Sequence, residues 1–257
     1  MKRKKMAASL LFAVLLAGGI LFVTPVVLTI ISSFRLEGTL SLQGYRELFF
    51  DCFPFYQMFW NSVLYSVSIT VGAIVIAVPA AFAFRFAIFP GKNALFVFYI
   101  VLMMMPLQVM ILPNYISIRD MKLINTPFAI ILPLLFSPLA VVVIHQFLRE
   151  FDIQMIEAAR LETNSCLKIL LFCIVPQMKV CLMAVGLLLY AETWNLVEQP
   201  LLYLEDDKWK NLSLLFSESE RYGAEILFPA SVLFMIPVLL WYLLFHEELR
   251  KGLKWVV

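Results

Sequence analysis

Long uncharged stretches alternate with short charged segments along almost the whole chain. After a basic start, residues 7–34 carry no charge. A run of this length can cross a bilayer as a helix and far exceeds the apolar core of a signal peptide, so we expect an uncleaved spanning helix. Five further apolar runs predict spans of similar kind, and the six expected spans are 7–34, 60–84, 94–115, 127–147, 170–196 and 226–245.

The composition agrees with an all-α integral membrane protein. The chain is 62% hydrophobic and 15% charged, with a mean hydropathy of +0.90, whereas soluble domains are about half apolar and a quarter charged. No repeat or low-complexity linker divides the sequence, so we expect one transmembrane domain over residues 1–257. The four cysteines show no paired spacing, which argues against a disulfide framework or a metal site.

The distribution of charge predicts the orientation. Six spans place both termini on one side, together with the turn near residues 85–92 and the loop 148–169. Most of the 20 Lys and Arg residues fall on that side. Because cytoplasmic loops carry an excess of Lys and Arg, we expect both termini and the loop 148–169 to be cytoplasmic.

The loop 148–169 holds the most informative stretch, which runs from Glu157 to Ser165 with Pro176 further on. Its charges are too many for lipid. Ala158 and Ala159 favour a short helix that can approach a partner closely, and Glu157 could pair with a basic residue of that partner. The alternative is an ordinary solvated loop, because Glu-Ala-Ala by itself is a weak string.

With Pro176 at its fixed distance, this stretch resembles the cytoplasmic "EAA" loop of ABC importer permeases. The likeness extends from Asn61 onward and is nearest to the carbohydrate-uptake branch, the maltose "G" type. The other matching segments are Met104-Met105-Pro106, Ile111-Leu112-Pro113, Trp194-Asn195, Gln199-Pro200-Leu201-Leu202-Tyr203-Leu204, Ile236-Pro237 and Lys251-Gly252-Leu253-Lys254.

The resemblance implies the type I importer permease fold with six transmembrane helices. It implies a heterodimer with a second homologous permease, two ATPase subunits that bind ATP and Mg, and an extracytoplasmic solute-binding protein. The chain itself would bind no cofactor. The residues that the resemblance assigns to ATPase coupling are Glu157, Ala158, Ala159, Arg160, Glu162, Thr163, Asn164 and Pro176.

The loop departs from the family at one position that matters. The family has Asp-Gly where this chain has Glu162-Thr163. Glycine tolerates a positive φ at the break between the two short helices. Our hypothesis is that Asn164 takes over that turn, because Asn visits the left-handed region more readily than Thr.

Polar residues within or beside the spans are candidates for the translocation pathway, since unpaired polar groups are costly in lipid. The alternative is that they join helices by hydrogen bonds, as polar residues in membranes commonly do. The pathway candidates are Asn61, Gln108, Asn114, Glu192 and Asn195.

Several chemistries find no support in the sequence. No phosphate-binding loop of the form G-x-x-x-x-G-K-[ST], no nucleophile with a base, no acidic metal cluster and no nucleic-acid signal is present. We therefore expect a non-enzymatic permease subunit of an ABC importer for sugars, in a bacterial or archaeal inner membrane. The alternatives are a permease for another solute such as a glycerophosphate, a secondary transporter or channel, and a membrane enzyme.

Overall fold

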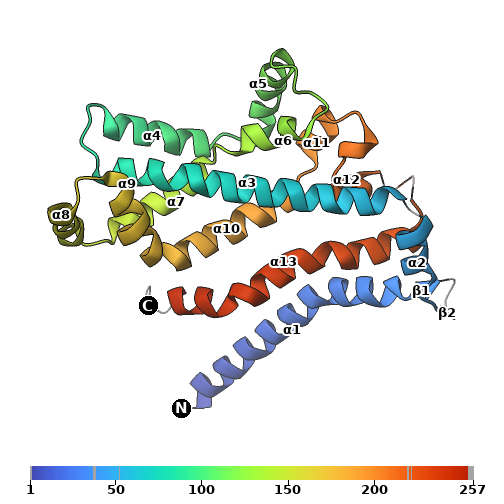
Figure 1. Cartoon of the computed structure of the whole chain (residues 1–257). Helices are drawn as coiled ribbons and strands as arrows, with labels where there is room; N and C mark the ends of the chain where they lie inside the picture. The colour runs from blue at the N-terminus through green and yellow to red at the C-terminus, as the bar shows by residue number, and fades with distance from the viewer. Residues whose placement is uncertain (1, 37–38, 52, 219, 221, 254–257) are drawn as a thin grey trace. The chain divides into compact units, whose positions relative to one another are not determined.

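The computed structural model describes residues 2–36, 39–51, 53–218, 220 and 222–253, and this part of the chain is helical apart from one short hairpin (Figure 1). Cys52 and Lys254 lie outside the described residues. The longer helices are α1 (Lys2–Ser33), α3 (Phe53–Phe86), α4 (Lys92–Met103), α5 (Leu107–Asp120), α6 (Pro127–Leu134), α7 (Pro138–Arg149), α8 (Ile153–Glu162), α10 (Lys179–Trp194) and α13 (Ala224–Leu253).

The chain forms two compact units, which are described separately. The first consists of Met1–Tyr56 and Glu218–Pro237, and the second of Gln57–Ser217 and Val238–Val257. The expectation of one transmembrane domain stays a prediction.

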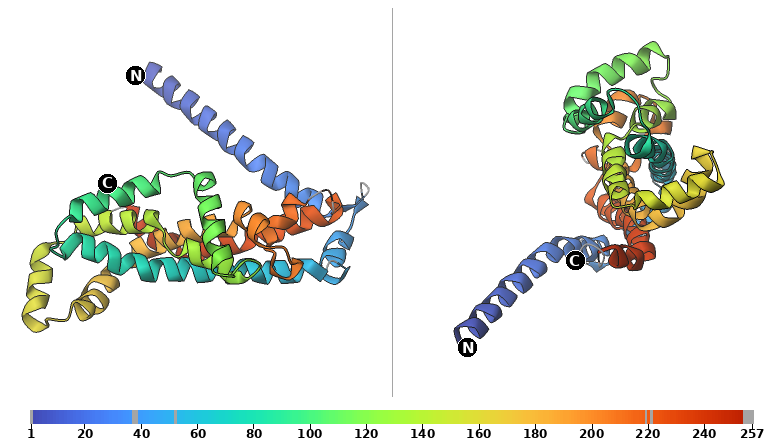
Figure 2. Two further views of the ribbon diagram at one scale, coloured as in Figure 1. Left: turned by 90° about the horizontal axis from the view of Figure 1, so that it is seen from above. Right: turned by 90° about the vertical axis from the view of Figure 1, so that its left-hand side faces the viewer.

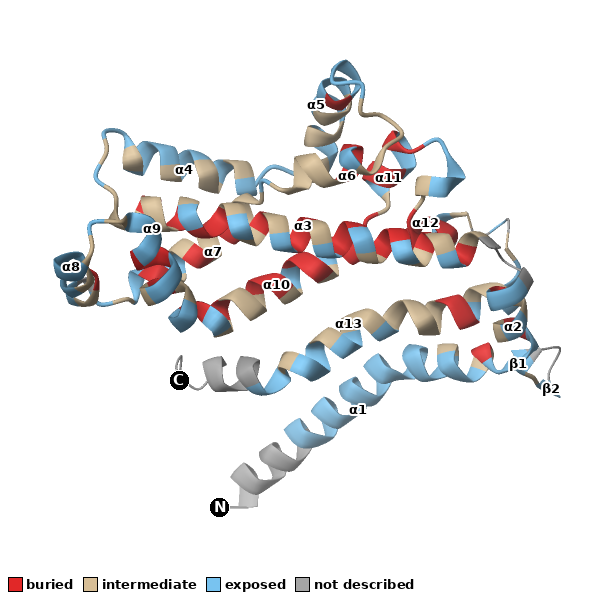
Figure 3. Cartoon of the chain, viewed as in Figure 1, coloured by how far each residue is buried: buried red, intermediate tan, exposed pale blue. Residues whose placement is uncertain are grey.

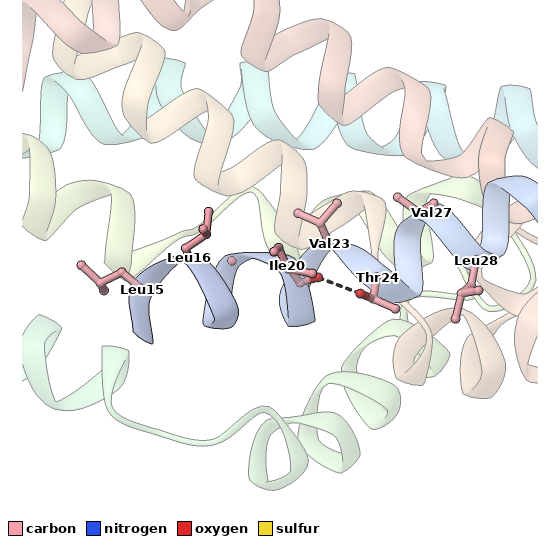
Figure 4. A pocket seen from close by; sticks show the side chains of 8 residues that line it. Leu15, Leu16, Ile20, Val23, Thr24, Val27 and Leu28 are labelled. Atoms are coloured by element: carbon pink, nitrogen blue, oxygen red, sulfur yellow. Dashed lines mark hydrogen bonds between the residues drawn. The ribbon is translucent and has the colours of Figure 1, made fainter. Parts of the chain in front are cut away.

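In the first unit, α1 presents apolar side chains to its surroundings from Leu11 onward (Figure 3). Its apolar segment Leu11–Ser33 is long enough to cross a membrane, and the most apolar part of this segment has no residue buried within the chain. An open hollow runs along one side of this helix, where Gly19 leaves space between Leu16 and Val23 (Figure 4). Thr24 faces the hollow, and its hydroxyl donates a 2.7 Å hydrogen bond to the Ile20 carbonyl of the same helix.

The segment after α1 folds into a short hairpin and a short helix. Strands β1 (Arg35–Leu36) and β2 (Thr39–Leu40) pair antiparallel and are followed by α2 (Gln43–Arg46). The hydroxyls of Ser33 and Tyr45 lie 2.9 Å apart and join the end of α1 to α2. Gly44 is buried where α2 meets the start of α13, and a Cβ there would lie 2.5 Å from the Glu225 carbonyl oxygen.

The second unit is built around α3. Ala73, Ala77 and Ala81 lie one helical turn apart and are at most 1% exposed. Small side chains at this spacing allow helices to approach closely in membranes. Gly186 allows α10 a similarly close contact with the Trp241 ring of α13, since a Cβ at position 186 would lie 3.3 Å from that ring. Side chains of α7, α8 and α10 complete this core.

Among the described residues, five helical segments are long and apolar enough to cross a membrane. The expected third span, 94–115, is different: α4 and α5 are separate helices that meet at 102°. Pro106 has an extended ψ of 144° and cannot donate a backbone hydrogen bond, so α5 starts anew after it. Counting this bent pair as one span gives six.

The other expected spans correspond to helical segments with shifted bounds, namely Leu11–Ser33, Pro54–Phe86, Pro127–Arg149, Cys166–Trp194 and Ala224–Glu247. The segment Pro127–Arg149 consists of α6 and α7 with a short break between them. There, the Ser137 hydroxyl accepts a 3.2 Å hydrogen bond from the Ala140 N–H, and Pro138 opens α7.

Candidate functional site

The charged loop folds into a short helix, α8, for local reasons. Asp152 precedes the helix, and its carboxylate accepts a 2.9 Å hydrogen bond from the Gln154 N–H. This is the N-cap arrangement, and it satisfies one of the free donors of the first turn. Arg160 lies in the last turn, where a positive charge interacts favourably with the helix dipole.

Helix α8 lies at one end of the second unit. Figures 1 and 2 show it beyond the C-terminal end of α3, near the connection to α4. The polar segment with α11 (Glu198–Tyr203) and α12 (Leu212–Ser217) lies toward the other end of α3 (Figure 1). The charged loop and the segment 198–217 therefore lie near opposite ends of α3.

One face of α8 belongs to the core of the chain itself. Ile156 is 2% exposed, and Met155 and Ala159 are partly buried against the same core. Of the two alanines that were expected to approach a partner, Ala159 therefore faces this chain, while Ala158 is exposed.

The opposite face of α8 is open. Glu157, Arg160 and Glu162 are exposed, and Leu161 between them is 90% exposed. The sequence analysis did not select Leu161, because a single apolar residue between the charged Arg160 and Glu162 gives no recognisable pattern. Its exposure is the signal: a large apolar side chain held in water is a candidate contact for another surface.

The hypothesis that Asn164 makes the turn with a positive φ is wrong. Among the described residues, the non-glycine positions with positive φ are Lys122 and Asn125. Instead, Thr163 is extended at φ −152°, and its hydroxyl accepts a 3.3 Å hydrogen bond from the Ser165 N–H. Ser165 then caps the next turn through the Lys168 N–H, so this break requires no left-handed residue.

Pro176 lies where the helix changes its hydrogen-bonding pattern. The chain passes from α9 (Cys166–Lys168) into a π-helical stretch, η2 (Ile169–Ile174), then a 3₁₀ stretch, η3 (Val175–Met178), and finally α10. Pro176 has no N–H, so the regular α-helical ladder cannot run through it. π-Helical turns often occur at functional sites.

Asn61, the first pathway candidate, is hydrogen-bonded within this fold. It is 8% exposed, and its amide donates to the carbonyls of Lys208 and Lys210 at 2.8 and 2.9 Å. The neighbouring Tyr65 hydroxyl donates to the Trp209 carbonyl at 2.7 Å. These bonds join α3 to the segment 207–210, as the alternative interpretation for polar residues expects.

The other pathway candidates lie on different elements. Gln108 on α5 donates a 3.1 Å hydrogen bond to the exposed Glu198 carboxylate. Asn114, also on α5, is half-buried. Glu192 is exposed near the end of α10, and the exposed Asn195 donates to the Ala191 carbonyl at 2.7 Å.

Gln199 is a buried polar residue that was not chosen as a candidate. It is 1% exposed, and neither its amide nitrogen nor its amide oxygen has a hydrogen-bond partner. Among the described residues, no three His, Cys, Asp or Glu side chains are grouped so that they could hold a metal ion.

Comparison with known proteins shows which proteins the chain is similar to. No family model matches the chain. The chain is 26% identical over 218 residues to the arabinooligosaccharides transport system permease protein AraQ of Halalkalibacterium halodurans, which covers 84% of this chain and 78% of that protein. It is 27% identical over 229 residues to the sn-glycerol-3-phosphate transport system permease protein UgpE of Brucella abortus, covering 85% and 81%. The chain is therefore similar to transport-system permeases along more than four fifths of its length, which confirms the resemblance stated for the loop 148–169.

Two further matches fit the permease. It is 31% identical over 153 residues to the sn-glycerol-3-phosphate permease UgpE of Salmonella typhi, covering 60% of this chain and 54% of that protein. A solved bacterial ABC transporter involved in the import of the acidic polysaccharide alginate has a chain of the same fold, with a TM-score of 0.84 and 18% identity over 95% of the permease and 97% of that chain. The expectation of a multi-pass transport subunit rather than an enzyme is confirmed.

Proposed function

We propose that the permease forms half of the translocation pathway of an ATP-driven importer and couples to an ATPase through α8. The observation that carries this proposal is the open face of α8, with Glu157, Ala158 and Leu161 presented at one end of the helical unit. In this proposal, the six spans include the bent pair α4 and α5, and both termini are cytoplasmic in a bacterial or archaeal inner membrane. ATP and Mg bind to the partner ATPase.

The remaining partners follow from the same assignment. A second, homologous permease would complete the pathway, two ATPase subunits would receive the α8 loops, and a solute-binding protein would dock on the opposite side. The exposed acidic residues around Glu205 lie toward the end of α3 that is far from α8 and fit that opposite side.

For the solute, we favour a sugar or an oligosaccharide. AraQ, whose name gives arabinooligosaccharides, aligns with most of this chain. The second candidate is a glycerophosphate, because the UgpE proteins align over a similar share. Uptake of arabinotriose and of sn-glycerol-3-phosphate by reconstituted transporter distinguishes the two.

Co-purification from native membranes tests the coupling role. Wild-type permease should bring down an ATPase and a second permease, and Glu157→Lys should lose the ATPase and keep the second permease. Glu205→Lys is the matched control, since it reverses an exposed carboxylate at the other end of the unit and should keep both partners. Retention of the ATPase by Glu157→Lys would contradict the proposed contact.

A further inference from the structure

Gln177 occupies the junction between the charged loop and α10. It lies in η3, directly after Pro176, where the helix changes from π to 3₁₀ form. Its amide nitrogen donates a 2.9 Å hydrogen bond to the Cys173 carbonyl in η2. The side chain thereby satisfies an acceptor in the irregular stretch, next to a residue that lacks an N–H.

The same nitrogen also reaches α8. It lies 3.1 Å from the Met155 sulfur, 22 residues away in the sequence. A primary amide has two N–H groups, so it can donate to a carbonyl and to a thioether, which is a weak acceptor. One side chain therefore touches both α8 and the start of the helix that continues as α10.

This lateral contact matters because the direct connection through the chain is irregular. Between α8 and α9 the backbone passes through the extended Thr163 and the non-helical Asn164. Such a joint can bend without moving α10. Apolar packing of Ile156 and Met155 holds α8 in place, and the Gln177 contact adds a directional bond to the same site.

We propose that Gln177 is a positioning residue whose contacts with Met155 and the Cys173 carbonyl hold α8 against the π-helical stretch that leads into α10. A displacement of α8 then moves α10 as one body. We call this pair of contacts the clasp. The proposal rests on the proposed function, in which the ATPase displaces α8. Removal of the clasp should leave the open face of α8 intact and therefore leave ATPase binding intact. It should uncouple the two helices from each other.

The test measures the distance between spin labels at Gln154→Cys on α8 and Leu188→Cys on α10, in a background where the four native cysteines are replaced by alanine. The transporter is purified with its ATPase and studied with and without ATP. With Gln177 present, ATP should leave the distance unchanged. With Gln177→Leu, ATP should shift it by about 1.5 Å or more, the rise of one helical residue.

Two further variants serve as a control and as an independent test of the same contact. Gln146→Leu makes the same substitution at an exposed position of α7 and should behave as the parent. Met155→Leu removes the sulfur acceptor at similar volume, should also produce the shift, and should add nothing to Gln177→Leu because both break one contact. If Gln177→Leu does not insert, Met155→Leu carries the test alone.

The outcomes separate the two proposals. An ATP-independent distance in both Gln177→Leu and Met155→Leu would overturn the clasp while leaving the coupling role of α8 in place. An equal shift in Gln146→Leu would overturn it as well. If wild-type permease brings down no ATPase, the proposed function fails and the clasp fails with it.

Discussion

At the residue scale, the polar residues within the spans divide into those that hold the fold and those that remain open to solvent or to partners. Asn61 belongs to the first group, because both of its donor bonds end on backbone carbonyls of the segment 207–210. Glu192 belongs to the second, as an exposed carboxylate near the end of α10. The sequence gives both residues the same local pattern, so tertiary contacts were needed to distinguish them.

Asn61→Leu should lower the free energy of unfolding by about 1–3 kcal/mol, because the Lys208 and Lys210 carbonyls lose the hydrogen bonds from the buried Asn61 amide. Gln57→Leu is the matched control. Gln57 is partly exposed and donates one 2.9 Å bond to the same Lys208 carbonyl, so its loss should cost less. Thermal unfolding in detergent measures both. A variant Asn61→Leu that keeps its stability but loses solute uptake would instead give Asn61 a role in the pathway.

Two asparagines provide a second comparison. Asn125 has φ 62°, and its side-chain oxygen accepts hydrogen bonds from the Glu205 and Asp206 N–H groups at 3.1 and 2.9 Å. Asn125→Ala should therefore destabilise the permease by about 1–3 kcal/mol through backbone strain and lost bonds. Asn164→Ala should change stability by less than about 0.5 kcal/mol, since no positive φ is required there. Equal effects of the two substitutions on thermal unfolding would contradict this assignment.

At the element scale, α8 depends on its cap and on its buried face. Ten residues are few for a helix in water, so its order comes from the Asp152 cap and from the packing of Ile156. The helix could be predicted from the Glu-Ala-Ala pattern, and its cytoplasmic side stays a prediction from the positive-inside rule. Which alanine faces the core could not, because that depends on how α8 packs against η2 and α10.

Asp152→Ala should weaken binding of the ATPase by up to about tenfold, because loss of an N-cap costs about 1 kcal/mol of helix stability. Asp152→Asn retains the cap and should bind as the wild type does. Glu150→Ala removes an exposed carboxylate two positions earlier and serves as the charge control. Titration of purified ATPase onto each permease variant measures the affinity. Equal ATPase affinities for Asp152→Ala and Asp152→Asn would contradict a contribution of the N-cap to ATPase binding.

At the scale of the whole molecule, the uncharged runs predicted the helical segments because a spanning helix needs a long stretch without charges. Which proline would separate α4 from α5 could not be predicted, since Pro106 and Pro113 look alike in the sequence. Pro106 separates the two helices, whereas Pro113 lies inside α5. The turn at Thr163 was also mispredicted, because a serine cap and an extended residue replaced the expected left-handed position.

Labelling of single cysteines tests the orientation. In a background without native cysteines, Glu162→Cys on α8 should react with a membrane-impermeant maleimide in inside-out vesicles. Glu205→Cys should react from the outside of intact cells. Both side chains are exposed, so labelling reports the side of the membrane rather than burial. Reaction of both positions from the same side would contradict the proposed topology.

The most direct test of the central claim is solute uptake by the permease reconstituted in proteoliposomes with its co-purified partners. The account predicts that arabinotriose or sn-glycerol-3-phosphate enters only when ATP is supplied to the ATPase, and that Glu157→Lys abolishes this uptake. Uptake that proceeds without ATP, or that Glu157→Lys leaves unchanged, would contradict it.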